Sequence, residues 1–87
     1  MINWRTIKKA IEDALSPFSV IVQYIPPTGK GDNAQCSEFL VTVLDDCTDF
    51  FDVVTSTLKP VCNLYNLSMY PEFPHIHLYA HWDIKVD

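Results

Sequence analysis

The chain has 87 residues and a formal net charge of −5, and 48% of its residues are hydrophobic and 13% aromatic. A chain of this length and composition forms one domain near the lower size limit of a hydrophobic core, and intrinsic disorder is excluded. Its few Lys and Arg residues are scattered, so it lacks the basic groove that binding of free nucleic acid requires.

The first predicted element is an amphipathic helix over residues 3–15. Four apolar residues recur at the spacing of one helical face: Trp4, Ile7, Ile11 and Leu15. Asn3 is a suitable N-cap, and Pro17 ends the segment. Because this helix has one apolar face, we expect it to pack on another element.

Two strands are predicted next, over residues 18–25 and 36–44, which are rich in β-branched and aromatic residues. The segment between them, residues 26–35, contains two Pro and two Gly. This composition predicts a long, exposed and mobile loop that carries Lys30.

A second helix is predicted over residues 46–59. Acidic residues gather at its start and Lys59 lies near its end, as the helix dipole favours. Pro60 is expected to terminate it. The apolar residues expected on its buried face are Phe50, Phe51, Val54 and Leu58.

A closing β-hairpin is predicted from two further strands over residues 61–70 and 74–82. The turn between them contains Pro71 and Pro74. The order of elements therefore predicts an α+β fold, a two-layer sandwich with two helices on one face of a four-stranded, mainly antiparallel sheet, and residues 1–87 as a single domain. The predicted core comprises Trp4, Ile7, Ile11, Phe39, Val41, Phe50, Val54, Leu58, Ile76, Leu78 and Trp82.

The cysteines and the N-terminus bear on location. Cys36, Cys47 and Cys62 form no C-x-x-C pair, so we expect reduced, mostly buried thiols, with one disulfide and a spare thiol as the alternative. The N-terminus leads directly into the first helix, and no apolar run approaches the roughly 20 residues of a membrane span. We therefore expect a soluble protein without a signal peptide, in the cytoplasm of a cell or, if the chain is viral, of the host cell or in the virion.

The four predicted strands carry almost no charge on either face. Glu38 is their only Asp, Glu, Lys or Arg residue. A sheet covered by helices on one side normally presents polar residues to water on the other, so this composition favours a second face that contacts a protein partner or another copy of the chain. The residues predicted to bind the partner are His75, His77, Tyr79, His81, Leu40, Thr42, Tyr24 and Lys30.

The remaining motifs bear on three kinds of chemistry. His75 and His77 are about 7 Å apart at the backbone of a strand, but the spacing supplies no third metal ligand. The segment Thr28-Gly-Lys-Gly-Asp lacks the spacing of a phosphate-binding loop and precedes a strand. No activated nucleophile is visible, so the sequence predicts a protein without enzymatic activity, metal or cofactor.

The order of elements resembles that of the small tail-terminator and tail-completion proteins of tailed bacteriophages. The resemblance covers an amphipathic first helix, a strand ending in Pro26-Pro27, a long loop, a strand, a second helix and a final β-hairpin. It implies a structural tail or neck subunit that forms a ring and docks on a tube through its sheet and the 26–35 loop.

A second functional class stays open beside this one. Small acidic proteins without catalytic motifs include phage-encoded inhibitors of host defence complexes. In that case the acidic start of the second helix would be the working surface, with Asp45, Asp46, Asp49 and Asp52 as its residues. The common alternative is that these carboxylates only cap the helix and face solvent.

Overall fold

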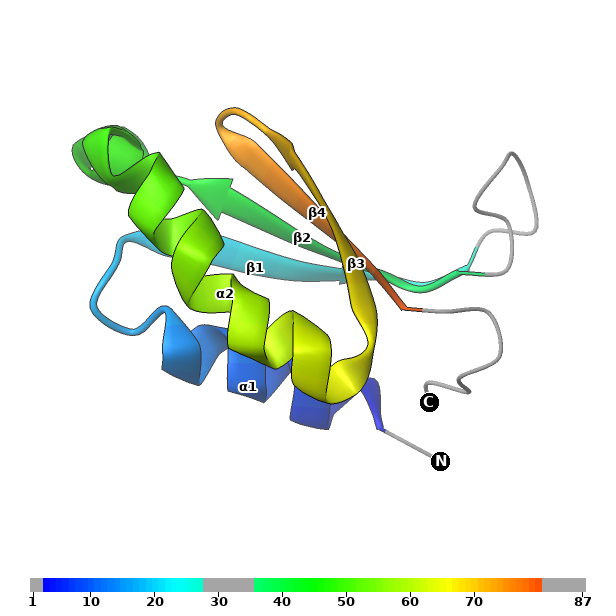
Figure 1. Ribbon diagram of the computed structural model, residues 1–87. Helices are drawn as coiled ribbons and strands as arrows, with labels where there is room; N and C mark the ends of the chain where they lie inside the picture. Colours follow the sequence, from blue (N-terminus) through cyan, green and yellow to red (C-terminus); the bar gives the residue numbers. More distant parts are fainter. Residues whose placement is uncertain (1–2, 28–35, 81–87) are drawn as a thin grey trace.

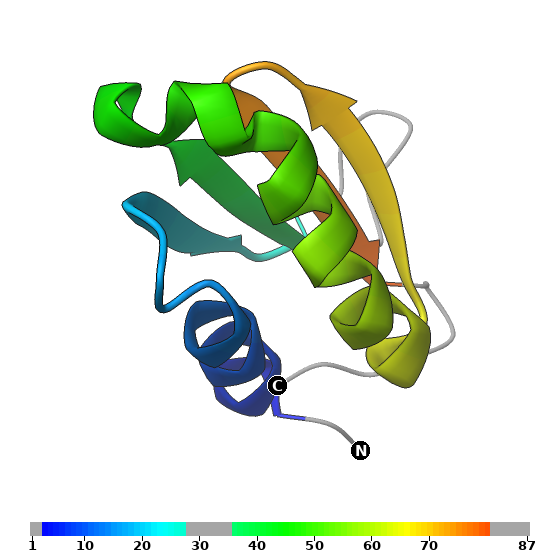
Figure 2. The same cartoon turned by 60° about the vertical axis from the view of Figure 1, so that its left-hand side comes forward.

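The computed structural model describes residues 3–27 and 36–80 as a two-layer α+β sandwich (Figure 1). The elements in chain order are α1 (Trp4–Ala14), β1 (Val20–Ile25), β2 (Glu38–Val43), the 3-10 helix η1 (Asp45–Phe50), α2 (Phe51–Tyr65), β3 (Leu67–Glu72) and β4 (His75–Ala80). The four strands form one sheet in the order β1-β2-β4-β3, and every neighbouring pair is antiparallel. Both α-helices lie on the same face of this sheet (Figure 2), which confirms the predicted fold class.

Helix α1 begins as the sequence predicts. The side chain of Asn3 accepts a hydrogen bond of 2.8 Å from the backbone N–H of Arg5, so it satisfies a donor that the first turn leaves free. Ile7, Ile11 and Leu15 are fully buried. The apolar face of α1 therefore points into the core, and its charged residues remain at the surface.

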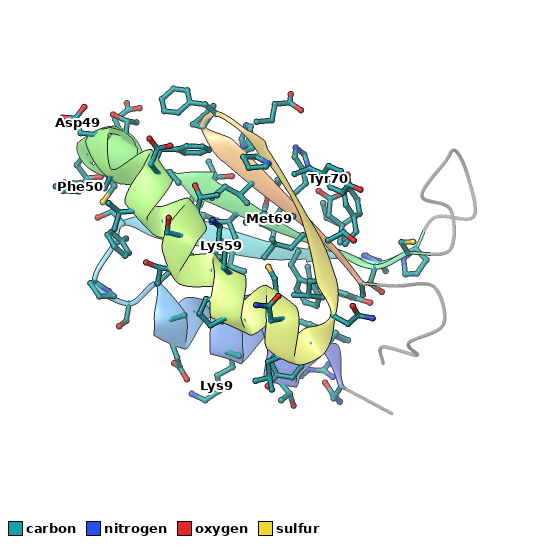
Figure 3. All side chains as sticks on the ribbon, in the orientation of Figure 1. Lys9, Asp49, Phe50, Lys59, Met69 and Tyr70 are labelled. Atoms are coloured by element: carbon teal, nitrogen blue, oxygen red, sulfur yellow. The ribbon has the colours of Figure 1, made fainter. Side chains whose placement is uncertain are left out.

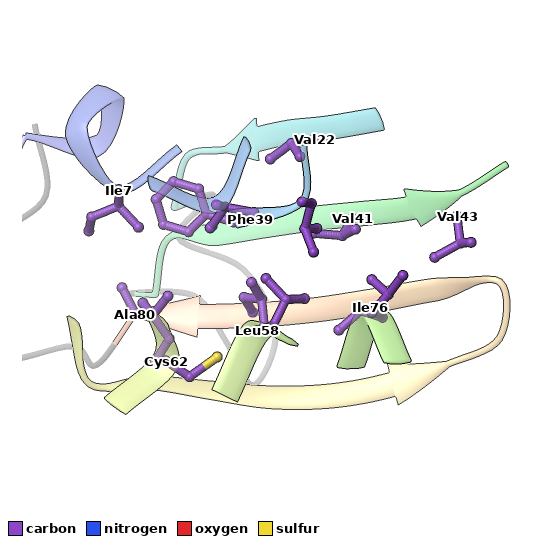
Figure 4. Close-up of a cluster of buried hydrophobic side chains, with 14 of the residues drawn as sticks. Ile7, Val22, Phe39, Val41, Val43, Leu58, Cys62, Ile76 and Ala80 are labelled. Atoms are coloured by element: carbon purple, nitrogen blue, oxygen red, sulfur yellow. The ribbon is translucent and has the colours of Figure 1, made fainter. Parts of the chain in front are cut away.

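The core lies between the helices and the two central strands. Phe39 of β2 is paired with Leu78 of β4, and Val41 is paired with Ile76, and all four side chains are fully buried. Helix α2 contributes Val54, Leu58 and Cys62 to the same core cluster, and Figure 4 shows Leu58 and Cys62 among the buried side chains of the strands. Burial of each large aliphatic or aromatic side chain stabilises the fold by about 1.5–3 kcal/mol.

The predicted end of α2 at Pro60 is wrong, and so is the strand predicted from residue 61. The helix continues to Tyr65. Val54, Leu58 and Cys62 are each four residues apart and all buried, so the helical core face extends past the proline. Pro60 itself is exposed, and its missing N–H is tolerated because burial of the following turn offsets the loss. The helix ends at Asn66, which adopts the left-handed conformation with φ 55°.

The predicted core position of Phe50 is also wrong. Residues before Phe51 form a 3-10 helix instead of the start of an α-helix, and Phe50 is 51% exposed. The tighter winding of that segment rotates its side chains relative to α2. Cys47 takes the inward position and accepts a hydrogen bond of 3.0 Å from the backbone N–H of Ser19. Of the other predicted core residues, Trp4 is only partly buried and packs against the core cluster, and Trp82 lies outside the described residues.

The closing hairpin has a shorter turn than predicted. Strand β3 runs through Pro71 to Glu72, and β4 begins at His75, so only Phe73 and Pro74 connect them. Glu72 therefore lies opposite His75 in the sheet instead of in a loop. Within residues 3–27 and 36–80, no helix has the length and hydropathy needed to cross a membrane.

Candidate functional site

The face of the sheet opposite the helices is the candidate functional site, and we call it the outer face. None of the described elements covers it (Figures 1 and 2). Side chains alternate across the strands, so the inward positions of β2 and β4 are buried and the positions between them point outward. Cross-strand pairing then arranges the outward residues in rows, which are Ile25–Glu38–Tyr79–Ser68, Gln23–Leu40–His77–Tyr70 and Ile21–Thr42–His75–Glu72.

The half of the outer face formed by β1 and the adjoining side of β2 is largely uncharged. Ile21 is 48% exposed, and Leu40 is partly buried beside Gln23. Exposed aliphatic side chains on a sheet gain free energy when a partner removes them from water. This half can therefore contribute burial to an interface.

A charged cluster lies on the other half, centred on His77. The Nδ1 of His77 is 2.7 Å from Oε2 of Glu38, and its Nε2 is 3.8 Å from Oε2 of Glu72. An ionised carboxylate can only accept a hydrogen bond, so Nδ1 carries the proton that is donated to Glu38. Glu38 is 16% exposed at its side chain and Glu72 is 81% exposed, so Glu72 presents the carboxylate that is open to solvent.

Two tyrosines flank this histidine. The ring of Tyr79 is parallel to that of His77, with centroids 6.2 Å apart, and it meets Tyr70 edge to face at 5.6 Å. Figure 3 shows Tyr70 on the side of the sheet away from the helices, whereas Met69, the preceding residue, points toward α2. Burial, and then the charge of Glu38, raise the pKa of the Tyr79 phenol above its ordinary value, so this group remains a neutral hydrogen-bonding partner at neutral pH.

These side chains enclose a shallow hollow of about 360 Å³. Its lining residues are Tyr70, Glu72, His77 and Tyr79. We call this the β3–β4 hollow. At its end, His75 lies with Nδ1 3.0 Å from the hydroxyl of Thr42, so its ring is held toward β2.

The structure brings together five of the residues predicted to bind a partner. His75, His77, Tyr79, Leu40 and Thr42 all lie on the outer face. His81 and Lys30 lie outside the described residues, as does most of the loop predicted over 26–35.

Tyr24, which the sequence also predicts to bind the partner, does not lie on the outer face. Tyr24 pairs with Phe39, an inward position, and its ring stacks on Trp4 of α1 with centroids 4.3 Å apart. Its hydroxyl lies 3.2 Å from that of Ser37. Each even-numbered residue of β1 pairs with an odd-numbered residue of β2, and the odd-numbered side chains of β2 are buried under the helices. The even-numbered side chains of β1 therefore face the helices as well.

Sequence reasoning missed Glu72, Tyr70 and Ile21 as members of the site. The sequence predicted Glu72 in the turn and the third strand over residues 61–70, whereas β3 spans Leu67–Glu72. The signal that could have found Tyr70 and Glu72 is the alternation from Leu67 to Glu72, in which Leu67 and Met69 face the core.

The histidines, acidic residues and cysteines are the groups of the described residues that metal or nucleophile chemistry would use. Among residues 3–27 and 36–80, no three His, Cys, Asp or Glu side chains are grouped as metal ligands would be. Cys36, Cys47 and Cys62 are free thiols, and burial raises the pKa of Cys62. A raised pKa keeps a thiol protonated, which is the opposite of what an activated nucleophile requires.

The acidic segment forms a separate surface at one end of the molecule (Figure 3). Asp45, Asp46, Asp49 and Asp52 are all exposed, and they belong to η1 and the first turn of α2. The carboxylate of Asp46 accepts a hydrogen bond of 2.9 Å from the hydroxyl of Ser19. Phe50 and Val53, which are interleaved with these residues in the sequence, are about half exposed.

Comparisons of this chain with protein-family profiles, curated protein sequences and solved structures found no match.

Proposed function

We propose that this protein is a non-enzymatic interaction or assembly protein that holds a protein partner, or another copy of itself, against the outer face of its sheet. The observation that carries the proposal is the composition of that face. Among residues 3–27 and 36–80, it presents aliphatic, aromatic and hydroxyl side chains in continuous rows, and Glu38 and Glu72 are the only Asp, Glu, Lys or Arg residues in these rows.

The physical reason is the balance between burial and desolvation. A solvent-facing sheet surface usually carries Lys, Glu and Thr, which are costly to remove from water. Here Tyr70, Tyr79 and Ile21 supply area that a partner can bury, and the phenols retain hydrogen-bonding capacity within a contact. Removing such a surface from water costs less free energy than removing a charged surface.

The specific form that we propose is a structural tail or neck subunit of phage type, which works as a homo-oligomer in the virion or the host cytoplasm. Its support is the resemblance in the order of elements, together with the open sheet face, which such a subunit needs for docking. The free thiols are compatible with a reducing compartment.

The experiment is substitution of a central residue of the face. Tyr79→Asp or His77→Asp places a carboxylate in the contact, so association should be lost while the far-ultraviolet circular dichroism stays unchanged. Ser56→Asp, on the exposed surface of α2, is the matched control and should associate as the native chain does. The readout is solution mass by light scattering at two protein concentrations, and capture of a partner from the source cells.

Acidification from about pH 7.5 to about pH 5.5 should weaken the same contact, because histidine gains its charge in this range. The titratable groups that face His77 are Glu38 of β2, Tyr70 and Glu72 of β3, and His75 and Tyr79 of its own strand. A strict monomer whose partner binding ignores both the substitutions and the pH would contradict the proposal.

A second candidate is the acidic inhibitor of a host complex. The observation that favours it is the surface of η1 and the first turn of α2, where the exposed carboxylates of Asp45, Asp46, Asp49 and Asp52 lie close in sequence to two exposed apolar side chains, Phe50 and Val53. Loss of partner binding on substitution of these aspartates by asparagine, with no effect of Tyr79→Asp, would replace the first proposal by this one.

A further inference from the structure

The β3–β4 hollow combines more kinds of functional group than burial of a contact surface requires. It combines an exposed carboxylate, two phenol rings and an imidazole within one shallow concavity on a face that is otherwise nearly uncharged. We propose that this hollow binds the side chain of an arginine presented by the protein partner. The inference deepens the proposed function and rests on it for the identity of the partner as a protein.

The charge of the hollow selects a cation. The carboxylate of Glu38 already accepts a hydrogen bond from Nδ1 of His77, with 2.7 Å between Nδ1 and Oε2. Glu72 is 81% exposed and its carboxylate is 3.8 Å from Nε2 of the same ring, beyond hydrogen-bonding distance. Its oxygens are therefore available to a donor that enters from solvent. Glu38 and Glu72 thus place two carboxylates beside the ring of His77.

No basic side chain of the described chain occupies this position. The salt bridges that lysines make in the described residues are both on α1, where Lys8 pairs with Glu12 and Lys9 with Asp13. Among residues 3–27 and 36–80, the carboxylates at His77 therefore have no lysine or arginine partner, and the imidazole of His77 is the basic group beside them. The chain as a whole has a net charge of −5, which also attracts a basic partner.

The rings favour arginine over lysine. A guanidinium is planar, so it can lie flat on a phenol face while its N–H groups donate in a fork to one carboxylate. Tyr70 is 59% exposed and sits beside Tyr79 and Glu72 at the mouth of the hollow. A lysine ammonium could pair with Glu72, but it would leave the ring faces without a matching planar group.

The ring tautomer completes the arrangement. Because Nδ1 of His77 holds the proton toward Glu38, Nε2 is an acceptor in the neutral ring and points toward Glu72. A guanidinium, which has five N–H donors, can donate to Nε2 and to the Glu72 carboxylate together. The hollow therefore offers acceptors and ring faces to one planar donor.

The test uses the full chain and small probes of defined charge. The amide spectrum of the isotopically labelled protein is titrated with N-acetylarginine methylamide, with its lysine counterpart, and with the neutral citrulline counterpart. We expect saturable shifts confined to β3 and β4 with the arginine probe, at an affinity on the order of millimolar for one side chain in a shallow site. The lysine probe should bind more weakly, and the citrulline probe should cause no saturable shift.

Two variants and a matched control locate the site. Glu72→Gln and Tyr70→Leu should each weaken binding of the arginine probe about three- to tenfold. Asp49→Asn removes one exposed carboxylate from η1, which contributes no lining residue to the hollow, and should leave the affinity unchanged. Equal weakening by Asp49→Asn, equal binding of citrulline or of lysine, or shifts that map elsewhere would each overturn the inference.

The outcomes separate this inference from the function on which it rests. If the arginine probe does not bind while Tyr79→Asp still abolishes association, the inference is wrong and the proposed function stands. If the probe binds as expected but the chain stays monomeric and captures no partner, the site is supported and the proposed function is overturned.

Discussion

The rings of Trp4 and Tyr24 stack almost in parallel, with centroids 4.3 Å apart and 5° between their planes. This contact joins the first turn of α1 to the edge strand β1, and Tyr24 also leans on the buried ring of Phe39. Because Tyr24 is part of the connection between the two layers, it contributes to stability and not to the outer face.

Tyr24→Ala should therefore lower the free energy of unfolding by about 1–3 kcal/mol through lost stacking and burial. Tyr70→Ala, on the exposed outer face, should change it by about 0.5 kcal/mol or less. Urea denaturation followed by circular dichroism measures both. Equal destabilisation by the two changes would show that Tyr24 has no special role in joining the layers.

Two phenylalanines test the corrected core. Phe39 is fully buried and Phe50 is 51% exposed. Phe39→Ala should cost about 3–5 kcal/mol of unfolding free energy, as expected for a buried aromatic residue. Phe50→Ala should cost about 1 kcal/mol or less, and chemical denaturation compares them directly. A large loss with Phe50→Ala would mean that η1 packs more deeply than described.

Tyr79 should ionise at higher pH than an ordinary tyrosine. Burial raises its pKa first, and the charges of Glu38 and Glu72 raise it further. The folded state then holds the proton more tightly than the unfolded state, so the stabilising contribution is present below the ordinary pKa of about 10 and is lost as pH rises through the raised value.

The measurement is an alkaline titration of the tyrosinate absorption band. Tyr79→Phe should remove the part of the transition that occurs at the highest pH, and Glu38→Gln should move that part to lower pH. An unchanged upper end of the titration in Tyr79→Phe would contradict this assignment.

The thiols should differ in reactivity. Cys36 is partly exposed, whereas Cys47 and Cys62 are buried, and burial raises the pKa of Cys62. Since the thiolate is the reactive form, a chromogenic disulfide reagent at mildly alkaline pH should label Cys36 first. Cys36→Ser should remove the fast phase, and urea should bring all remaining thiols to one rate. Fast labelling of Cys62 in the folded chain would be inconsistent with its burial.

The alternation of the central strands made most of the sheet predictable. In β2 and β4, apolar residues alternate with polar or aromatic ones, as with Phe39 and Val41 in the first and Ile76 and Leu78 in the second. This two-residue period predicts both the strand and the side chains that point into the core. Asn3 and the apolar face of the first helix were equally local signals.

Pro60 is where local reasoning failed. A proline followed by Val61 indicates the end of a helix and the start of a strand, yet Cys62 packs on the core at helical spacing from Leu58. Tertiary packing outweighed the local preference. That error displaced β3 and so hid Glu72 from the predicted site. His77 was predicted, but its contacts with Glu38 and Glu72 depend on the register of three strands, which no short segment specifies.

The strand order also has a consequence for how the chain folds. The two hairpins, β1 with β2 and β3 with β4, are joined through pairing of β2 with β4. Thr42 and His75 are the paired residues of β2 and β4 that lie closest in sequence, and all of η1, α2 and β3 still separates them. Closing this long segment costs chain entropy before the central contacts can compensate for it. A nick between Leu44 and Asp45 would leave each half with an unpaired strand edge and an uncovered apolar layer. Neither half should fold alone, and complementation of the two fragments should restore the native spectrum only when both are present.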